Sequence, residues 1–159
     1  MPAHRFSTVL GDCRICWEGE HVSGFGLLTD LPGDDAPPPW IERIAQRVRS
    51  HLAGAPEDFV NVPYDWPRVT DFQAAVYRAA LAVKSGRTAT YGDLARALNQ
   101  PIGVSRAVGV ALGQNPWPLL VPCHRFVGAD GRMTGFSAPG GIQTKLRLLA
   151  IEGSQLFAD

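Results

Sequence analysis

The chain has 159 residues, 45% of them hydrophobic, and its 15 basic side chains are matched by 15 acidic ones. This is enough apolar material for one domain of ordinary size or for two small domains that share a core. No apolar run approaches the length of a membrane span, and the N-terminus leads into no signal-peptide core, so we expect a soluble cytoplasmic protein with no membrane partner. The three cysteines, an odd number, predict reduced thiols and not a disulfide framework.

Charge is distributed unevenly along the chain although it sums to zero. Residues 1–83 hold seven Lys/Arg against eleven Asp/Glu, and residues 84–159 hold eight against four, so the two parts carry about −4 and +4. A basic C-terminal half is suited to face nucleic acid. Ordinary solvated surface is the alternative explanation, so the asymmetry supports a nucleic-acid partner without establishing one.

The N-terminal residues carry the pattern of strands. Residues 6–28 predict a β-hairpin or meander with a turn at 18–20, and four apolar side chains are spaced for one face of extended chain: Val9, Cys13, Ile15 and Trp17. Cys13 and Cys16 form a C-x-x-C with His21 nearby, which invites a metal or redox site. In a strand, however, positions three apart point to opposite faces and cannot hold one ion, so we expect no metal.

A loop, an amphipathic helix and an irregular segment follow. The adjacent Asp34 and Asp35 and three consecutive prolines make residues 30–39 a loop. Residues 40–52 show helical spacing, with arginines on the outer side and a buried stripe at Ile41, Ile44, Ala45, Val48 and Leu52. Residues 53–69 are proline-rich, with a short strand predicted at 59–62. We place the boundary between an N-terminal domain (1–66) and a C-terminal domain (67–159) there.

The pattern becomes helical after the boundary. Thr70 and Gln73 fit a capping box, which opens a helix that Ser85–Gly86 ends. The predicted buried stripe of this helix comprises Phe72, Ala75, Val76, Ala79, Ala80 and Val83. Thr90 and Asp93 predict a second cap. We expect a short helix from there to residue 98, a break at 99–101 and a third helix over 104–112. Together they have the outline of a helix-turn-helix.

The last third predicts a turn and a final helix. Residues 128–131 suit a hairpin turn, with residues 132–136 as the returning segment. The helix over 142–151 stops at Gly153, and its predicted apolar face comprises Ile142, Leu146, Leu149 and Ala150. Glu152 lies at the C-terminus of this helix, where a carboxylate opposes the helix dipole, so we expect a local partner for it.

One short segment stands out chemically. Cys123 is followed by His124 and Arg125, in a stretch with prolines at 116, 118 and 122. The thiolate is the reactive form of cysteine, and a neighbouring base or positive charge lowers the pKa of a thiol, so Cys123 is a candidate nucleophile. On the residues alone, a buried cysteine with a chance histidine beside it is the alternative.

Five motifs in order give this segment its context: Thr90–Ala95, Ser105–Gly109, Asn115–Arg125, Gly135–Ser137 and Leu148–Gly153. On these residues the chain resembles the O6-alkylguanine-DNA alkyltransferases, the methylated-DNA–protein-cysteine methyltransferases. The resemblance runs from about residue 72 to residue 153, and its Pro-Cys-His-Arg core with the upstream Asn-Pro is highly specific.

The resemblance implies a fold and a function. The fold would be an RNase H-like α/β cap followed by a mostly α, winged-helix-like domain that contains the helix-turn-helix. The function would be direct-reversal DNA repair, in which a single-turnover enzyme transfers an alkyl group from O6 of guanine to its own cysteine. Such a protein acts as a monomer on double-stranded DNA containing O6-alkylguanine, associates with the nucleoid and requires no cofactor.

The resemblance also implies roles for individual residues. Cys123 would be the nucleophile, His124 its base through water, Glu152 the group that orients His124, and Asn115 a brace for the segment. On the DNA side, the slender third helix would enter the minor groove with Ser105, Arg106 and Ala107, and Arg106 would fill the gap that an extruded base leaves in the stack. Tyr91, on the preceding helix, would press on the backbone beside the target base. The base pocket would be lined by Val121, Phe136, Ser137 and Leu112.

Some features leave alternatives open. Arg125 is expected to anchor an internal ion pair and not to act in catalysis, and Tyr91 would otherwise be a core residue. Residues 135–141 are two longer than the commonest form of the family, and Phe136 stands where many members have tyrosine, which bears on pocket size and alkyl preference. Two other functions remain: a lesion-recognition module without chemistry, which Cys123 argues against, and a regulatory winged-helix DNA-binding domain whose cysteine senses alkylation or oxidation.

Overall fold

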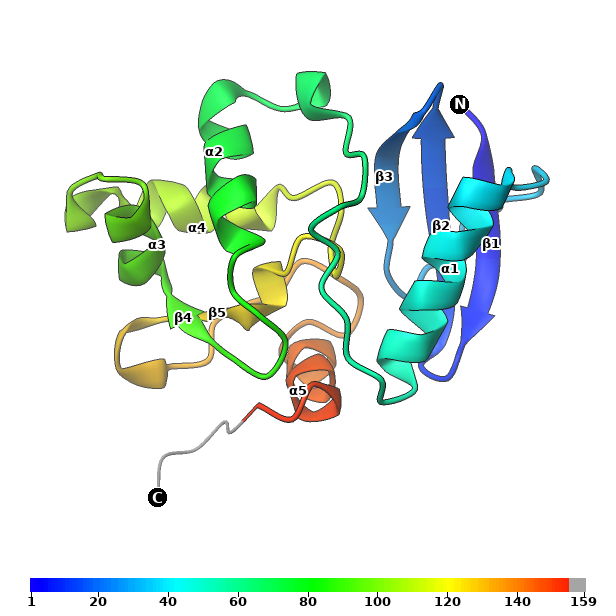
Figure 1. The fold of residues 1–159 in the computed structure, drawn as a ribbon. Coiled ribbons are helices and arrows are strands. Elements are labelled where there is room, and N and C mark those ends of the chain that lie inside the picture. Colours follow the sequence, from blue (N-terminus) through cyan, green and yellow to red (C-terminus); the bar gives the residue numbers. More distant parts are fainter. Residues whose placement is uncertain (155–159) are drawn as a thin grey trace.

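A small antiparallel sheet and one helix form one end of the molecule, and four helices form the other. The computed structural model describes residues 1–154, apart from the side chain of Ile102. The sheet has the order β1 (Ala3–Thr8), β2 (Gly11–Glu18), β3 (His21–Gly26). Helix α1 (Pro39–Leu52) packs on it, and residues 53–70 run between the two ends (Figure 1). Within residues 1–154, no helix combines the length and apolar character needed to cross a bilayer.

The predicted meander is confirmed, with one misplaced residue. Cys13, Ile15 and Trp17 are buried at alternating positions of β2. Val9 lies in the turn between β1 and β2 and is 70% exposed, because the chain reverses there and not only at residues 18–20. Cys16 is buried as well. No group of three or more metal-ligating side chains is arranged around an ion position within residues 1–154.

Helix α1 forms as predicted, and the segment after it does not. All five predicted stripe residues of α1 are buried. The predicted strand at 59–62 is wrong, since these residues form a turn. Pairing occurs just beyond it, where Tyr64 makes a single bridge to Val22 of β3 and donates its hydroxyl to the carbonyl of Phe59 (2.7 Å). Pro63 lacks an N–H group, so the segment cannot continue a regular ladder.

Helix α2 (Asp71–Ala80) begins at the predicted capping box, and its buried face agrees with the prediction only in part. Thr70 and Gln73 exchange both capping hydrogen bonds. The helix ends at Ala80, before Ser85–Gly86. Its buried residues are Ala74, Val76, Tyr77 and Ala80, while Phe72 and Ala75 are exposed. The stripe is rotated because Tyr77 donates its hydroxyl to the carbonyl of Ala111 (2.6 Å), which allows this polar-tipped ring to be buried.

Two short helices follow, as predicted. Helix α3 (Tyr91–Ala97) has a capping box in which Asp93 takes the part of the usual glutamate. The chain reverses at Asn99 (φ 57°), passes through a 3₁₀ turn (Ile102–Val104) and continues as α4 (Ser105–Gly113), which packs on α3 and α2.

A second, two-stranded sheet joins β4 (Ala89–Thr90) to β5 (Phe126–Val127) in parallel. The turn after β5 is closed by the amide of Gly128 donating to the carbonyl of Arg132 (2.8 Å). The returning residues 132–136 form no strand, so the predicted hairpin is only partly correct. They lie instead beside α3 and the final helix, where Thr134 hydrogen-bonds Tyr91 and Lys145.

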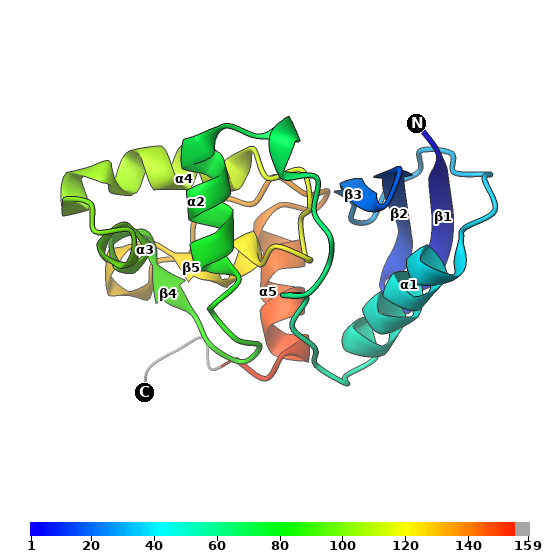
Figure 2. The same ribbon diagram turned by 45° about the horizontal axis from the view of Figure 1, so that its top comes forward.

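Helix α5 (Ile142–Ile151) has the predicted bounds, but of its predicted apolar face only Leu149 is fully buried. Thr144, Lys145, Leu148 and Leu149 are buried, whereas Ile142 and Ala150 are exposed and Leu146 is half-buried. Lys145 can be buried because its ammonium donates to the carbonyl of Phe126 (2.6 Å). Figure 2 shows α5 on the side of the helical end that faces α1, and one apolar core runs through both ends.

Candidate active site

The candidate nucleophile follows a tight proline-rich loop between α4 and a 3₁₀ turn (Cys123–Arg125). The side chain of Asn115 bridges two points of this loop. Its amide nitrogen donates to the carbonyl of Val121 (3.0 Å), and its oxygen accepts from the backbone amide of Trp117 (2.9 Å). Leu119 adopts a left-handed conformation (φ 79°), which is unusual for a residue with a side chain. The loop therefore has one defined shape that sets the position of Cys123.

The thiol of Cys123 lies in a buried but polar environment. The residue is 7% exposed. Burial raises the pKa of the Cys123 thiol, and a hydrogen bond from Asn115, the positive charge of Lys145 and backbone hydrogen bonds at Leu119 and Cys123 itself oppose this rise. These groups all stabilise the thiolate, so the negative charge has partners in place once a base removes the proton.

His124 and Glu152, the predicted base and the residue predicted to orient it, are in direct contact. Nε2 of His124 is 2.8 Å from Oε2 of Glu152, and both side chains are fully buried. Because the carboxylate takes the Nε2 hydrogen, Nδ1 is the nitrogen that can accept a proton, and it has no hydrogen-bond partner within residues 1–154. Burial lowers the pKa of His124, although Glu152 opposes this, so the ring is held neutral.

Arg125 anchors the segment, as expected. Its guanidinium is 2% exposed and makes a two-pronged contact with Glu152, with Nε to Oε1 and Nη2 to Oε2 both at 3.0 Å. It also contacts Asp58 (2.9 Å), the carbonyl of Val83 (2.7 Å) and the hydroxyl of Ser85 (2.8 Å). All five guanidinium N–H groups can thus find acceptors, which is what a buried arginine requires.

A small hollow of about 50 Å³ opens next to Cys123. Its lining comprises Tyr91, Gly109, Leu112, Gly113, Cys123, Gly135, Phe136 and Ser137. Three of the four predicted pocket residues are therefore present. Val121 is not among the lining residues, because it is fully buried in the loop behind the cysteine. Gly109 and Gly113 lack side chains where α4 passes the hollow, which leaves the thiol approachable from that helix.

Comparison with known proteins identifies the family of this chain. The family model described as "6-O-methylguanine DNA methyltransferase, DNA binding domain" matches residues 71–154. The chain belongs to the 6-O-methylguanine DNA methyltransferase family. A methylated-DNA–protein-cysteine methyltransferase of Mycobacterium tuberculosis is 42% identical over 113 residues, which is 71% of this chain but 66%, just under two thirds, of that relative's length. One from Methanosarcina acetivorans is 31% identical over 156 residues and is covered over 96% of its length.

Solved structures of the family share the whole fold. A crystal structure of Mycobacterium tuberculosis OGT in complex with DNA matches with a TM-score of 0.80 and 33% identity, covering 96% of this chain and 93% of that one. An O6-methylguanine-DNA methyltransferase from Pyrococcus kodakaraensis matches with a TM-score of 0.71 and 29% identity, covering 96% and 98%. The likeness therefore includes the N-terminal sheet and α1, where the sequence motifs of the family were not recognised.

The residues predicted to face DNA lie at the N-terminal ends of α3 and α4. Arg106 and Ala107 are exposed in the first turn of α4, and Ser105 beside them is half-buried. Tyr91 begins α3, is half-buried, and hydrogen-bonds Thr134 through its hydroxyl. Tyr91 also lines the hollow at Cys123, so it connects the helix pair to the candidate nucleophile.

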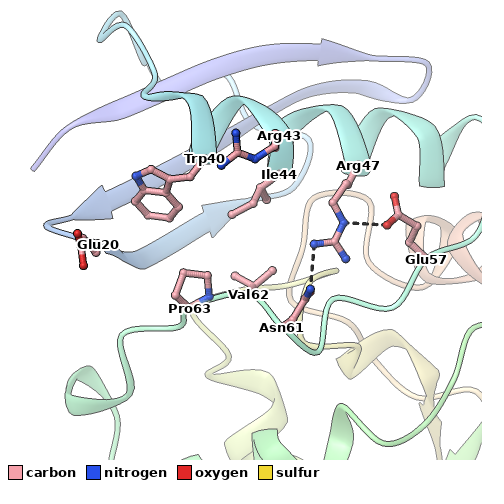
Figure 3. Close-up of a pocket in the computed structure, with 9 residues that line it drawn as sticks. All are labelled: Glu20, Trp40, Arg43, Ile44, Arg47, Glu57, Asn61, Val62 and Pro63. Carbon is pink, nitrogen blue, oxygen red and sulfur yellow. Dashed lines mark hydrogen bonds and ion pairs between the residues drawn. The ribbon is translucent and has the colours of Figure 1, made fainter.

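A wider hollow of about 720 Å³ lies away from Cys123, between α1 and residues 57–63 (Figure 3). Arg47 crosses it to reach Glu57 (2.8 Å) and Asn61 (3.2 Å), with Trp40 and Arg43 further along α1. None of the predicted site residues lines this hollow, and it holds no nucleophile. Its size alone does not make it the site of the chemistry.

One residue of the site was missed by sequence reasoning. His51, in the last turn of α1, places Nε2 2.8 Å from Oε2 of Glu152, and both side chains are fully buried. The two residues are 101 positions apart. No motif surrounds His51, so only the packing of α1 near α5 could reveal this contact.

Proposed function

We propose that this chain repairs O6-alkylguanine in double-stranded DNA by transferring the alkyl group to Cys123. The sulfur forms a bond to the alkyl carbon while the bond from that carbon to O6 breaks, and the electron pair and a proton pass to the guanine, which is restored. The thioether has no easy leaving path, so each molecule reacts once. The observation that carries this proposal is the buried Cys123 beside a histidine whose free nitrogen is Nδ1 and whose other nitrogen is held by Glu152.

The proton is moved by His124. Nδ1 accepts the thiol proton through a water molecule, and the adjacent carboxylate of Glu152 stabilises the imidazolium that forms. Asn115 holds the loop and donates to the sulfur as its charge develops. Phe136 and Ser137 wall the pocket, and the Ser137 hydroxyl takes the place of the tyrosine hydroxyl found in many members of the family.

The α3–α4 pair acts as the DNA-binding helix-turn-helix of a winged-helix-like domain. Arg106 occupies the gap in the base stack when the guanine is extruded, and Tyr91 presses on the adjacent backbone. The N-terminal sheet and α1 serve as the RNase H-like cap, with the division near residues 66–67. The protein works as a monomer in the cytoplasm, on nucleoid DNA, without a cofactor.

Intact-protein and peptide mass spectrometry tests this proposal. The wild-type chain and Cys123→Ala are each incubated with a duplex that carries one O6-methylguanine. We expect one methyl group on the wild-type protein, located on Cys123, and none on the variant. Arg106→Ala should keep the chemistry but react more slowly at low DNA concentration, because it lacks the side chain that stabilises the extruded state. Tight binding without any mass change would instead support a lesion-recognition module.

A further inference from the structure

His51 connects the N-terminal part of the molecule to the base system of the candidate active site. It lies at the end of α1, and its ring is fully buried between the site and the ring of Phe59 (5.7 Å between centroids, T-shaped). Its two ring nitrogens have different partners. Nε2 faces Glu152 (2.8 Å), and Nδ1 faces the backbone amide of Glu57 (2.9 Å).

These partners fix the tautomer of His51. A backbone amide can only donate, so Nδ1 of His51 must accept and carries no hydrogen. The hydrogen of the neutral ring is therefore on Nε2 and points at the carboxylate. The backbone amide of Glu57, in the segment after α1, therefore determines that Nε2 of His51 is the donor to Glu152.

The contact completes the set of donors around one carboxylate oxygen. Oε2 of Glu152 faces Nε2 of His51, Nε2 of His124 and Nη2 of Arg125, while Oε1 takes Nε of Arg125. These four hydrogen bonds, three at Oε2 and one at Oε1, hold the carboxylate in one orientation. It therefore holds the Nε2–H of His124, leaves Nδ1 of that ring facing away, and stays ionised while His124 carries a proton.

We infer that His51 is a positioning residue for the alkyl transfer, which acts by holding Glu152 against His124. This inference rests on the proposed function, because it names what the N-terminal part contributes to the same reaction. The competing explanation is purely structural: His51 ties the chain after α1 through its contact with the Glu57 amide and has no effect on the base system.

Two amide substitutions separate these explanations. In His51→Gln the side-chain nitrogen falls near the original Nε2, so it keeps the donor to Glu152. In His51→Asn the side-chain oxygen can still accept from the Glu57 amide, but the side chain is too short to reach Glu152. His21→Asn, at an exposed position at the start of β3, is the matched control for the loss of a histidine.

Single-turnover methyl transfer at saturating protein, together with DNA affinity measured by fluorescence anisotropy, gives the readout. We expect His51→Asn to transfer about tenfold more slowly than wild type, His51→Gln to stay within about threefold, and His21→Asn to match wild type, all with unchanged DNA affinity. A wild-type rate in His51→Asn, or a His51→Gln variant as slow as His51→Asn, would overturn the inference. A wild-type protein that never becomes methylated would sink the proposed function itself.

A second measurement uses the wild-type protein only. Long-range ¹⁵N NMR of the histidine rings reports which nitrogen carries the hydrogen. We expect Nε2–H for both His51 and His124. A hydrogen on Nδ1 of either ring would contradict the arrangement and remove the basis of the inference.

Discussion

Burial shifts the pKa values of Cys123 and His124 in opposite directions. It raises the pKa of the Cys123 thiol and lowers the pKa of His124. Both groups are therefore neutral when the protein waits for substrate, which avoids placing a charged pair in the interior. Burial alone would also raise the pKa of Glu152, but hydrogen bonds from His124, His51 and Arg125 hold it well below its usual range. The permanent anion of the site is thus Glu152.

The lowered pKa of His124 predicts how the reaction depends on pH. Only the neutral ring can accept the thiol proton, and a depressed pKa keeps the ring neutral below the ordinary histidine value of about 6.5. The rate constant of methyl transfer should therefore stay level from about pH 8 down through pH 6.5, and fall only below it. Single-turnover rates across this range, with circular dichroism to verify folding at each pH, check this; a half-maximal rate at or above pH 6.5 would contradict it.

At the scale of elements, the small side chains of α4 let another molecule come close to this helix, at a cost to helix stability. Arg106 is its one charged side chain, Val110 is 55% exposed, and Gly109 faces Tyr91 across the hollow at Cys123. A glycine within a helix costs about 1 kcal/mol relative to alanine. A methyl group at position 109 would meet the Tyr91 ring only at 4.0 Å, an ordinary contact, so nothing in the protein itself requires glycine here.

Gly109→Ala should accordingly stabilise the protein and impair the reaction. We expect the free energy of unfolding to rise by about 1 kcal/mol, measured by urea denaturation. The added methyl group lies at the wall of the hollow, so methyl transfer should slow severalfold, measured under single-turnover conditions. Gly19→Ala is not a suitable control, because Gly19 has a positive φ (59°) that strains any other residue. Ala75→Gly, on the exposed side of α2, tests the helix contribution alone and should lower the free energy of unfolding. A Gly109→Ala variant that reacts at the wild-type rate would show that glycine there does not serve the site.

At the scale of the whole molecule, the two ends are joined by polar contacts as well as by the core. The indole of Trp117 donates to the carbonyl of Val22 in β3 (2.9 Å), and the amide of Phe25 donates to the carbonyl of Pro116 (2.9 Å). Arg125 reaches Asp58, and His51 reaches Glu152. The loop that leads to the candidate nucleophile is therefore supported directly by the N-terminal sheet.

This arrangement predicts that both ends unfold together. Removing either end would expose buried apolar surface and leave Arg125 and Glu152 without part of their partners. Urea unfolding followed by far-UV circular dichroism and by tryptophan fluorescence should give coincident transitions. Two separate transitions would show that residues 1–66 and 67–159 fold as independent units.

Residue patterns were sufficient to specify most of the local structure and the family of this protein. Each of these signals is local in the sequence, and each predicted a correct element: the capping residues Thr70 and Thr90, the apolar spacing of α1, and the alternation of buried and less buried residues in β2. The Pro-Cys-His-Arg segment carried the family, because that chemistry depends on adjacent residue types. The buried faces of α2 and α5 were predicted less well, since Tyr77 and Lys145 look polar in sequence and become buried only by finding distant acceptors.

Packing in three dimensions was needed to show which distant residues meet at Arg125 and Glu152. Asp58 and His51 carry no local signal, and the turn at 59–62 replaces a predicted strand because pairing is governed by the sheet next to it. A buried carboxylate needs donors from every direction, and elements far apart in the chain supply them once the core brings α1 and α5 together. Hydrophobic periodicity specifies that these helices pack, but the polar contacts made at their meeting point depend on how they pack.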